Sequence, residues 1–358
     1  MKKLLTILAA AFCIAGMMVS CGGSDSDAVK VGVSMPTKDL QRWNQDGANM
    51  KKALEERGYE VDLQYANNDI ATQVSQVENM IATGSEVLVI ASIDGSALKA
   101  VLDTAKQKGI KVIAYDRLIM NSDAVSYYAT FDNYKVGTIQ GNYLVEQLKL
   151  KDRSSADPAY IELFTGSPDD NNINFFFGGA MDILTPYIDN GALVVKSGQT
   201  SKAQCATLNW STEEAQKRME NLISAQGYGP NKTRLDAVYS SNDSCANGIT
   251  NALVAAGYTA DNFPIITGQD CDITSTKNML KGLQAMSVFK DTRALAAKVV
   301  DMVDSICKGS EPPINDTTTY DNGTGVIPSY LCEPVFGTKD NYKELLIDSG
   351  YYTEDQLK

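Results

Sequence analysis

The sequence of 358 residues contains no histidine, and this absence excludes several kinds of site. Without imidazole there is no Ser-His-Asp or Cys-His nucleophile pair, no histidine-ligated zinc, and no imidazole acid or base near neutral pH. Basic side chains are also in deficit, with 32 Lys and Arg against 44 Asp and Glu, a net charge of −12. Because a phosphate backbone requires a clustered basic surface, this balance argues against a nucleic-acid partner. An enzyme that uses carboxylates, Lys, Tyr or Ser for catalysis is not excluded.

Several sequence motifs are also missing. The first βα turn carries no GxGxxG and the chain has no GxxxxGK, so nucleotide binding is disfavoured. Asp169 and Asp170 are adjacent, which does not give the carboxylate spacing of a glycosidase unless a partner comes from elsewhere. There is no calcium-loop spacing and no CxxC pair. We therefore expect neither a metal nor a cofactor, although the acidic clusters leave a metal as an alternative.

Residues 1–20 have the features of a targeting segment, with a basic start and an apolar stretch over 4–18. That stretch has about 15 residues, which is short of the roughly 20 that a membrane span needs. The run Met18-Val19-Ser20-Cys21 resembles a bacterial lipobox. We expect a lipoprotein signal peptide, acylation of Cys21, a lipidated tether over 21–27, and a chain anchored to a bacterial membrane that faces the periplasm or the cell exterior. The alternative is an ordinary cleaved signal peptide.

Beyond this N-terminal segment the cysteines are odd in number and widely spaced: Cys205, Cys245, Cys271, Cys307 and Cys332. Neither a disulfide scaffold nor a metal site is indicated by such spacing. We expect mostly buried free thiols, with one or two disulfides as the alternative.

From residue 29 onward, short apolar runs alternate with helical patterns. The predicted strands lie at 29–35, 61–65, 87–90 and 111–115, and again at 160–164, 193–196, 235–239, 264–267 and 286–289. The predicted helices lie at 45–57, 70–83, 98–108, 176–187, 212–225, 246–257, 274–282 and 341–348. Strands separated by helices favour right-handed βαβ units and parallel sheets. Two such sets predict an α/β protein of two doubly wound, Rossmann-like lobes.

In open α/β sheets ligands bind beyond the carboxyl ends of the strands, so the residues that follow each strand matter most. The polar residues at these ends include Arg42, Asp94, Asp116, Arg117, Asn171, Asn172, Asn242, Asp270 and Lys290. Such carboxylate, amide and guanidinium groups suit a polyhydroxylated ligand, because each sugar hydroxyl both donates and accepts a hydrogen bond. The two tryptophans of the chain, Trp43 and Trp210, could cover the apolar face of a sugar ring.

Each of these residues also has an ordinary structural explanation. A lone Asp or Asn at a strand end more often caps a helix, and a Trp more often lies in the core. Asp116 and Arg117 could form an internal ion pair, and Lys290 and Asp291 could lie at a solvent-exposed edge of the protein. Together the residues favour a binding site, because nearly every strand end in both halves carries one, which capping and core packing do not require.

The runs that carry a family resemblance are Arg42-Trp43, 90–95, 115–119, 127–133, 166–172, 268–270, 289–293 and 350–358. In these runs the chain resembles the type I periplasmic sugar-binding proteins of ABC transporters, in the branch of xylose-binding and ChvE-type multiple-sugar-binding proteins. The resemblance covers almost the whole mature chain. It implies two lobes joined by three crossing segments near Asp132, Lys290 and Ile327, with the sugar held in the cleft. The implied N-terminal lobe is 28–133 plus 291–326, and the implied C-terminal lobe is 134–290 plus 327–358.

The resemblance also implies roles for individual residues. The expected contacts of the N-terminal lobe are Arg42, Asp94 and Arg117. The expected polar contacts of the C-terminal lobe are Asn172, Asn242, Asp270 and Lys290, with Asn171 as the alternative to Asn172, and Trp210 is expected to stack on the sugar. Trp43 and Asp116 join the set because they lie at strand ends.

The expected function is that of an extracytoplasmic solute-binding lipoprotein rather than an enzyme. It would capture an aldose monosaccharide (a pentose, a hexose or a uronic acid) by hinge closure and deliver it to an ABC sugar permease. Whether a membrane sensor is a second partner is left open. The chain is expected to be a monomer. The alternatives are a surface-anchored, carboxylate-dependent glycoside hydrolase and a receptor of the same fold for a nucleoside or a signalling furanose.

Overall fold

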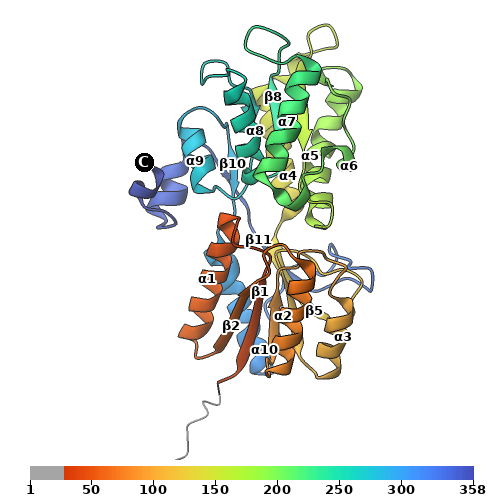
Figure 1. Cartoon of the computed structure of the whole chain (residues 1–358), viewed down its shortest axis with the longest axis vertical. Helices are drawn as coiled ribbons and strands as arrows, with labels where there is room; N and C mark the ends of the chain where they lie inside the picture. Colours follow the sequence, from red (N-terminus) through yellow and green to blue (C-terminus); the bar gives the residue numbers. More distant parts are fainter. Residues whose placement is uncertain (1–27) are drawn as a thin grey trace, which may run out of the picture.

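The computed structural model describes residues 28–358, which form two lobes stacked along the long axis of the molecule (Figure 1). The expected signal peptide over 1–20, the tether over 21–27 and the acylation site Cys21 lie outside the described residues. In each lobe a sheet is covered by helices on both faces. The α/β fold with two doubly wound lobes is therefore as the sequence predicted.

The N-terminal lobe contains a parallel sheet with the strand order β11-β5-β4-β3-β1-β2. Its strands are β1 (Lys30–Met35), β2 (Glu60–Tyr65), β3 (Val87–Ile90), β4 (Lys111–Tyr115), β5 (Val125–Phe131) and β11 (Ser329–Cys332). The helices α1 (Gln41–Glu56) and α10 (Thr292–Cys307) pack on one face, and α2 (Ile70–Ala82) and α3 (Lys99–Gln107) on the other. The central strands are buried on both faces, which is why they form continuous apolar runs in the sequence.

The C-terminal lobe contains a second parallel sheet with the order β7-β6-β8-β9. Its strands are β6 (Ala159–Phe164), β7 (Leu193–Val195), β8 (Ala237–Ser240) and β9 (Ile265–Ile266). The helices are α4 (Asn133–Gln147), α5 (Asn172–Asp189), α6 (Lys202–Cys205), α7 (Thr212–Gln226), α8 (Asp243–Ala255) and α9 (Ile273–Leu280). Short helical turns lie at η1 (Leu150–Asp152), η2 (Leu208–Trp210), η3 (Lys343–Asp348) and η4 (Glu354–Leu357). The predicted terminal helix at 341–348 is thus present as the turn η3.

The predicted strand at 286–289 forms differently from the expectation. This strand, β10 (Ser287–Phe289), pairs antiparallel with β12 (Val335–Gly337) rather than joining the parallel set as a full strand. An isolated bridge between Gln269 and Val288 still places it beside the chain that follows β9. The strand β12 was not predicted, because it has only three residues and two of them are solvent-exposed.

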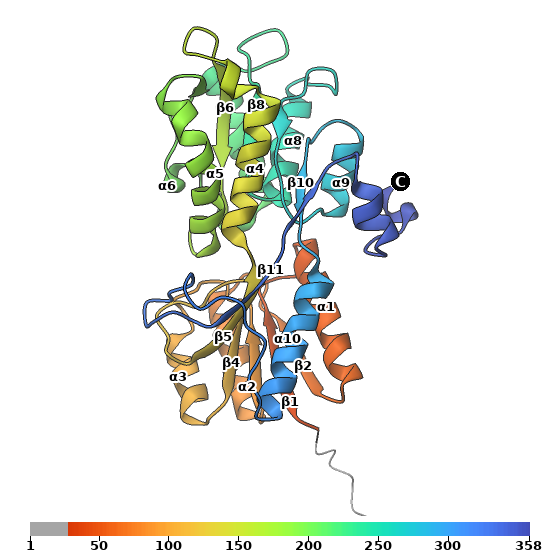
Figure 2. The same cartoon turned by 180° about the vertical axis from the view of Figure 1, so that it is seen from behind.

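The three crossings between the lobes are visible from behind in Figure 2. The chain passes from β5 into α4 at Asp132, and it returns between β10 and α10 at Lys290, as expected. The third crossing differs from the expected position near Ile327. Because β11 pairs with β5 in the N-terminal sheet, residues 327–332 belong to the N-terminal lobe and the chain crosses only after Cys332. The expected lobe boundary at 326 is therefore wrong by this one strand.

Within residues 28–358, no helix combines the length and apolar character needed to cross a membrane. The five cysteines in this part of the chain are all free, and all are buried except Cys307. The cysteines are therefore mostly buried free thiols, as expected.

Candidate functional site

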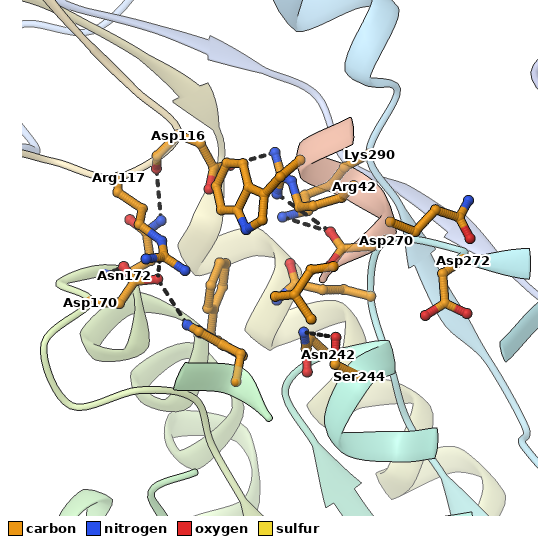
Figure 3. A pocket seen from close by; sticks show the side chains of 16 residues that line it. Arg42, Asp116, Arg117, Asp170, Asn172, Asn242, Ser244, Asp270, Asp272 and Lys290 are labelled. Atoms are coloured by element: carbon orange, nitrogen blue, oxygen red, sulfur yellow. Dashed lines mark hydrogen bonds and ion pairs between the residues drawn. The ribbon is translucent and has the colours of Figure 1, made fainter. Parts of the chain in front are cut away.

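A cavity lies between the lobes, at the carboxyl ends of the strands of both sheets (Figure 3). The lining residues are Leu40, Gln41, Arg42, Trp43, Asp116, Arg117, Asp170, Asn172, Phe176, Trp210, Asn242, Ser244, Gln269, Asp270, Asp272 and Lys290. Nine of the eleven residues expected from the sequence are among them.

The N-terminal lobe contributes the first turn of α1 and the loop after β4. Arg42 and Trp43 lie in that first turn, and Asp116 and Arg117 follow the last residue of β4. The indole ring of Trp43 lies 4.8 Å from the guanidinium of Arg42 and 5.1 Å from that of Arg117. Its Nε1 is buried without a hydrogen-bond partner among the described residues. A ligand in the cavity that accepts a hydrogen bond from this nitrogen would satisfy it.

The C-terminal lobe contributes loops that precede α5, α7, α8 and α9. Trp210 lies in η2, and its Nε1 donates to Asp170 Oδ2 at 3.1 Å. A Cβ at Gly166 would lie 2.0 Å from the ring of Trp210, so this position needs glycine for the indole to lie against the backbone. Asn242 is the N-cap of α8, with its Oδ1 accepting from Cys245 N at 3.0 Å, while the residue also faces the cavity.

Each cation of the cavity wall is paired with a carboxylate. Arg42 has Nε 2.8 Å from Asp46 Oδ2, Nη2 2.9 Å from Asp116 Oδ1, and Nη1 3.5 Å from Asp270 Oδ1. Lys290 Nζ lies 3.0 Å from Asp270 Oδ1. Figure 3 shows these three residues, Arg42, Asp270 and Lys290, converging at one side of the cavity.

The remaining pair lies at the other side of the cavity and joins the lobes. Arg117 Nε, in the N-terminal lobe, lies 3.1 Å from Asp170 Oδ2 in the C-terminal lobe. Nearby, Gly95 N donates to Asp169 O at 3.4 Å across the same boundary. Together with the Arg42–Asp270 pair, these contacts show that the lobes are closed in this structure.

Burial and these pairs shift the pKa values in opposite directions. Burial alone would raise the pKa of Asp116, but Arg42, Lys290 and Arg117 outweigh it, so the pKa of Asp116 lies below its usual value. Burial opposes the charge of Arg42, yet Asp116, Asp46 and Asp270 raise its pKa well above the ordinary value. Burial raises the pKa of Asp170, although Arg117 acts against it.

The chain matches the family model described as the periplasmic binding protein domain over residues 31–311. It belongs to this family. Over 360 residues and 100% of both chains it is 50% identical to the multiple sugar-binding periplasmic receptor ChvE of Rhizobium radiobacter. It is 37% identical to the D-xylose-binding periplasmic protein of Escherichia coli K12, with 92% of each chain covered.

A solved structure of an ABC transporter solute-binding protein from Clostridium phytofermentans with bound β-D-glucose is 64% identical to this chain. The TM-score is 0.89, with 92% of this chain and 100% of the other covered. These comparisons confirm the resemblance seen in the sequence. Because the family consists of receptors that bind their ligands, this member is a binding protein rather than an enzyme, and the glycoside-hydrolase alternative is set aside.

Two expected residues of this periplasmic binding protein lie outside the cavity lining. The Oδ1 of Asp94 accepts from Ser96 N at 2.7 Å, in the turn that precedes α3. The Oδ1 of Asn171 accepts from Asn174 Nδ2 at 3.0 Å at the start of α5. Both side chains hold local helix-start structure, which is the ordinary explanation for such residues. Neither Asp94 nor Asn171, the alternative to Asn172, lines the cavity, so their expected role as ligand contacts stays a prediction that this structure does not support.

Asn172 faces the cavity, but most of its amide is used between the lobes. Its Nδ2 donates to Asp116 O at 2.7 Å, and its Oδ1 accepts from Tyr128 OH and from Asn133 Nδ2, each at 3.0 Å. Asn172 therefore couples the two lobes, with the cavity on one side of its side chain.

Sequence reasoning missed several lining residues: Leu40, Gln41, Asp170, Phe176, Ser244, Gln269 and Asp272. Asp170 and Gln269 are adjacent to predicted residues, so the strand-end rule could have found them. Phe176 carries no such signal, because an aromatic residue within a helix is indistinguishable from a core residue in the sequence. Within the described part of the chain, no group of three or more Cys, Asp and Glu side chains is arranged as metal ligands.

Proposed function

We propose that this chain captures a neutral aldose monosaccharide in the cavity between its lobes and delivers it to an ABC permease. The observation that carries the proposal is the composition of the cavity wall. The wall contains carboxylates and cations that are already paired with one another. It also contains a tryptophan from each lobe. This is the combination that a ring of neutral hydroxyl groups requires.

The charge balance favours a neutral sugar over a uronic acid. The wall contains the cations Arg42, Arg117 and Lys290 and the carboxylates Asp116, Asp170, Asp270 and Asp272. A uronate would therefore bring a further negative charge into a buried site in which each cation already has a partner. Desolvating that charge without a free counter-ion is unfavourable.

The polar atoms can support micromolar affinity. A hydrogen bond to a charged group contributes about 1.5–3 kcal/mol, and a micromolar Kd corresponds to about −8 kcal/mol. Three or four such bonds are therefore sufficient for a micromolar Kd. The buried indole nitrogen of Trp43 and the Oε1 of Gln269, which have no hydrogen-bond partner among the described residues, are further partners for the sugar. The rings of Trp43, Trp210 and Phe176 would cover the apolar faces of the sugar.

Hinge closure follows from the division of these groups between the lobes. Arg42, Trp43, Asp116 and Arg117 come from the N-terminal lobe, and the other polar lining groups come mostly from the C-terminal lobe. A sugar that contacts both sets binds the closed form more tightly than the open form and shifts the population toward closure. A permease, or a membrane sensor, would then recognise the closed arrangement of the lobes.

A thermal-shift and calorimetric screen tests this proposal. The ligands are D-glucose, D-xylose, D-galactose, D-glucuronate and a nucleoside, each at the same concentration. We expect 1:1 binding of at least one neutral aldose, and binding of D-glucuronate at least tenfold weaker, since stabilisation follows RT ln(1 + [L]/Kd). Strongest stabilisation by D-glucuronate would contradict the neutral-sugar assignment, and stabilisation by the nucleoside alone would contradict sugar binding.

We also propose that Cys21 carries a lipid that anchors the protein to a bacterial membrane on its outer side. The support is the run Met18-Val19-Ser20-Cys21 and the polar residues that follow it. Expression of the full chain and of the Cys21→Ala variant in a bacterial host, with a clickable fatty acid in the medium, tests this directly. Equal labelling of both proteins would contradict acylation at Cys21.

A further inference from the structure

The chain after β12 packs on the C-terminal lobe but also contacts the N-terminal lobe. We call residues 338–358 the terminal segment. Its apolar residues Leu346, Tyr352 and Leu357 pack against Cys271 and Phe289. In Figures 1 and 2 the segment lies beside α9, at the level of the boundary between the lobes.

The contact with the N-terminal lobe is made to the first turns of α1. The amide of Gln41 reaches the C-terminal lobe with both of its polar atoms: Nε2 donates to Tyr352 OH at 2.6 Å, and Oε1 accepts from Ile273 N at 3.1 Å. One turn further on, Gln45 Nε2 donates to Tyr352 OH at 3.4 Å, and Gln45 Oε1 accepts from Tyr351 OH at 3.2 Å. Gln41 is adjacent to Arg42, the cation at the centre of the cavity wall.

The hydroxyl of Tyr352 joins the two lobes at a single atom. It donates to Cys271 O at 3.0 Å, in the loop that also carries Asp270 and Asp272, and it accepts from Gln41 and Gln45. One donated and two accepted bonds use the full capacity of a hydroxyl group. Tyr352 is 3% exposed, yet it does not line the cavity.

The neighbouring Tyr351 holds the segment at the second crossing. Its hydroxyl lies 3.2 Å from Thr292 Oγ1, its ring packs edge-on against Phe289 with 4.8 Å between centroids, and the guanidinium of Arg293 lies 4.9 Å from the ring. The segment therefore sits where the chain passes between the lobes and is positioned to respond to their relative movement.

We propose that the terminal segment is a latch, in which the Tyr352 hydroxyl bonds to α1 when the lobes close and so sets ligand affinity without contacting the ligand. Tyr352 is thus a positioning residue. The inference rests on the proposed capture of a sugar by closure. Opening the cleft would separate α1 from the loop at 270–273 and exchange these hydrogen bonds for bonds to water. The latch would therefore slow opening more than it speeds closing.

The test uses Tyr352→Phe, which removes the hydroxyl and keeps the ring in its apolar contacts. One neutral hydrogen bond changes an equilibrium constant about fivefold, so loss of the two bonds that join Tyr352 to α1, from Gln41 and from Gln45, should weaken D-glucose binding about five- to thirtyfold. The change should appear in the dissociation rate measured by stopped-flow fluorescence, with the association rate within about twofold of wild type. The matched control is Tyr143→Phe, whose hydroxyl bonds to Ala285 O at 3.4 Å within the C-terminal lobe.

A second variant, Gln45→Ala, removes one of the two partners of Tyr352 on α1, together with the bond from Tyr351, and leaves Gln41 in place. Gln45 does not line the cavity, and Ala is favourable in a helix, so this variant is expected to fold even if Tyr352→Phe does not. It should raise the dissociation rate, and the double variant should show less than the sum of the two effects, because both remove the same contact. Small-angle scattering of the ligand-free proteins should show a lower closed fraction in both variants than in wild type.

The outcomes separate the latch from the proposed function. If wild type binds no sugar in the screen, the proposed function fails and the scattering comparison alone decides on the latch. The latch is overturned if Tyr352→Phe and Gln45→Ala leave both scattering and dissociation rate as in the Tyr143→Phe control. It is also overturned if the loss of affinity lies entirely in the association rate.

Discussion

Asp270 offers the sharpest test of the site, because its carboxylate lies between both lobes and the cavity. Its Oδ1 is 3.0 Å from Lys290 Nζ and 3.5 Å from Arg42 Nη1, and its backbone has φ of 97°. An Asp270→Ala substitution would combine the loss of charge with strain at this φ. Asp270→Asn is cleaner, since asparagine tolerates positive φ, keeps the shape of the side chain and removes only the charge.

The magnitude follows from the bonds that lose their ionic partner. Hydrogen bonds with one charged partner are about twice as strong as neutral ones, a difference of about 1 kcal/mol each. Asp270→Asn weakens the contact with Arg42 that joins the closed lobes and the bond expected to the sugar, which gives about 2 kcal/mol, or roughly a thirtyfold increase in Kd. Lys290, with a side chain 2% exposed, is also left without its carboxylate, so a lower Tm is expected as well.

Calorimetric titration at 25 °C, well below the Tm, separates the two effects. Wild type and Asp270→Asn should both titrate with a stoichiometry near one, and only the Kd should differ. The control is Asp94→Asn, because Asp94 also follows a strand of the N-terminal sheet but lies outside the cavity lining. An Asp270→Asn Kd within twofold of wild type would refute the reasoning, as would an equal loss of affinity in Asp94→Asn.

Three further predictions concern the aromatic wall, the pH dependence and the packing of the C-terminal lobe. Trp210→Ala should weaken sugar binding at least tenfold in calorimetry, because it removes a ring and the donor to Asp170, and an unchanged Kd would exclude Trp210 from the site. Affinity measured from pH 6.5 to 8 should be nearly flat, since Asp116 has a lowered pKa and remains ionised there, whereas the raised pKa of Asp170 makes the acid side the place where binding weakens first. The contribution of Asp116 to stability is lost only in acid, as the pH falls through that lowered pKa, and a steep change in Kd above pH 6.5 would contradict this reasoning. Gly137→Ala should lower the Tm, because a Cβ there would lie 2.1 Å from Phe176 O, with an expected cost of about 1–3 kcal/mol. Gly178→Ala in α5 meets no atom within 4 Å and should leave the Tm unchanged or raise it, so equal destabilisation by both would refute the packing argument.

Most of the parallel strands, but not β5, were predictable because burial on both faces leaves an uninterrupted apolar run. The helix α4 was missed for the opposite reason. Its buried residues include Val136, Gly137, Gln140, Gly141 and Leu144, so two glycines and a glutamine interrupt the apolar stripe by which an amphipathic helix is recognised. The glycines allow α4 to pack closely against α5. This packing depends on the partner helix, so the sequence of α4 alone does not reveal it. The helix α10, in contrast, has ordinary apolar spacing and could have been predicted.

The rule that ligands bind beyond strand ends identified most of the cavity wall but could not assign side-chain directions. Asp94 and Asp170 both follow strands, yet Asp94 caps a turn and Asp170 is 4% exposed in the cavity wall. The same carboxylate chemistry serves either purpose, and the choice depends on the loop backbone. In the run from Asp169 to Asn172 the sequence favoured Asn172, with Asn171 as the alternative, whereas the cavity is lined by Asp170 and Asn172.

The partners of Arg42 show how the backbone of the hinge determines the site. Asp116 and Asp270 both have positive φ, 58° and 97°, conformations that cost about 1–3 kcal/mol each for residues other than glycine. Each is held by a backbone hydrogen bond: Asp116 N donates to Ala129 O in β5 at 2.7 Å, and Asp270 N donates to Val288 O in β10 at 2.8 Å. The strands β5 and β10 each lead directly into a crossing between the lobes. The direction of both carboxylates is therefore tied to the hinge strands, so that lobe closure and charge pairing around Arg42 are expected to be coupled.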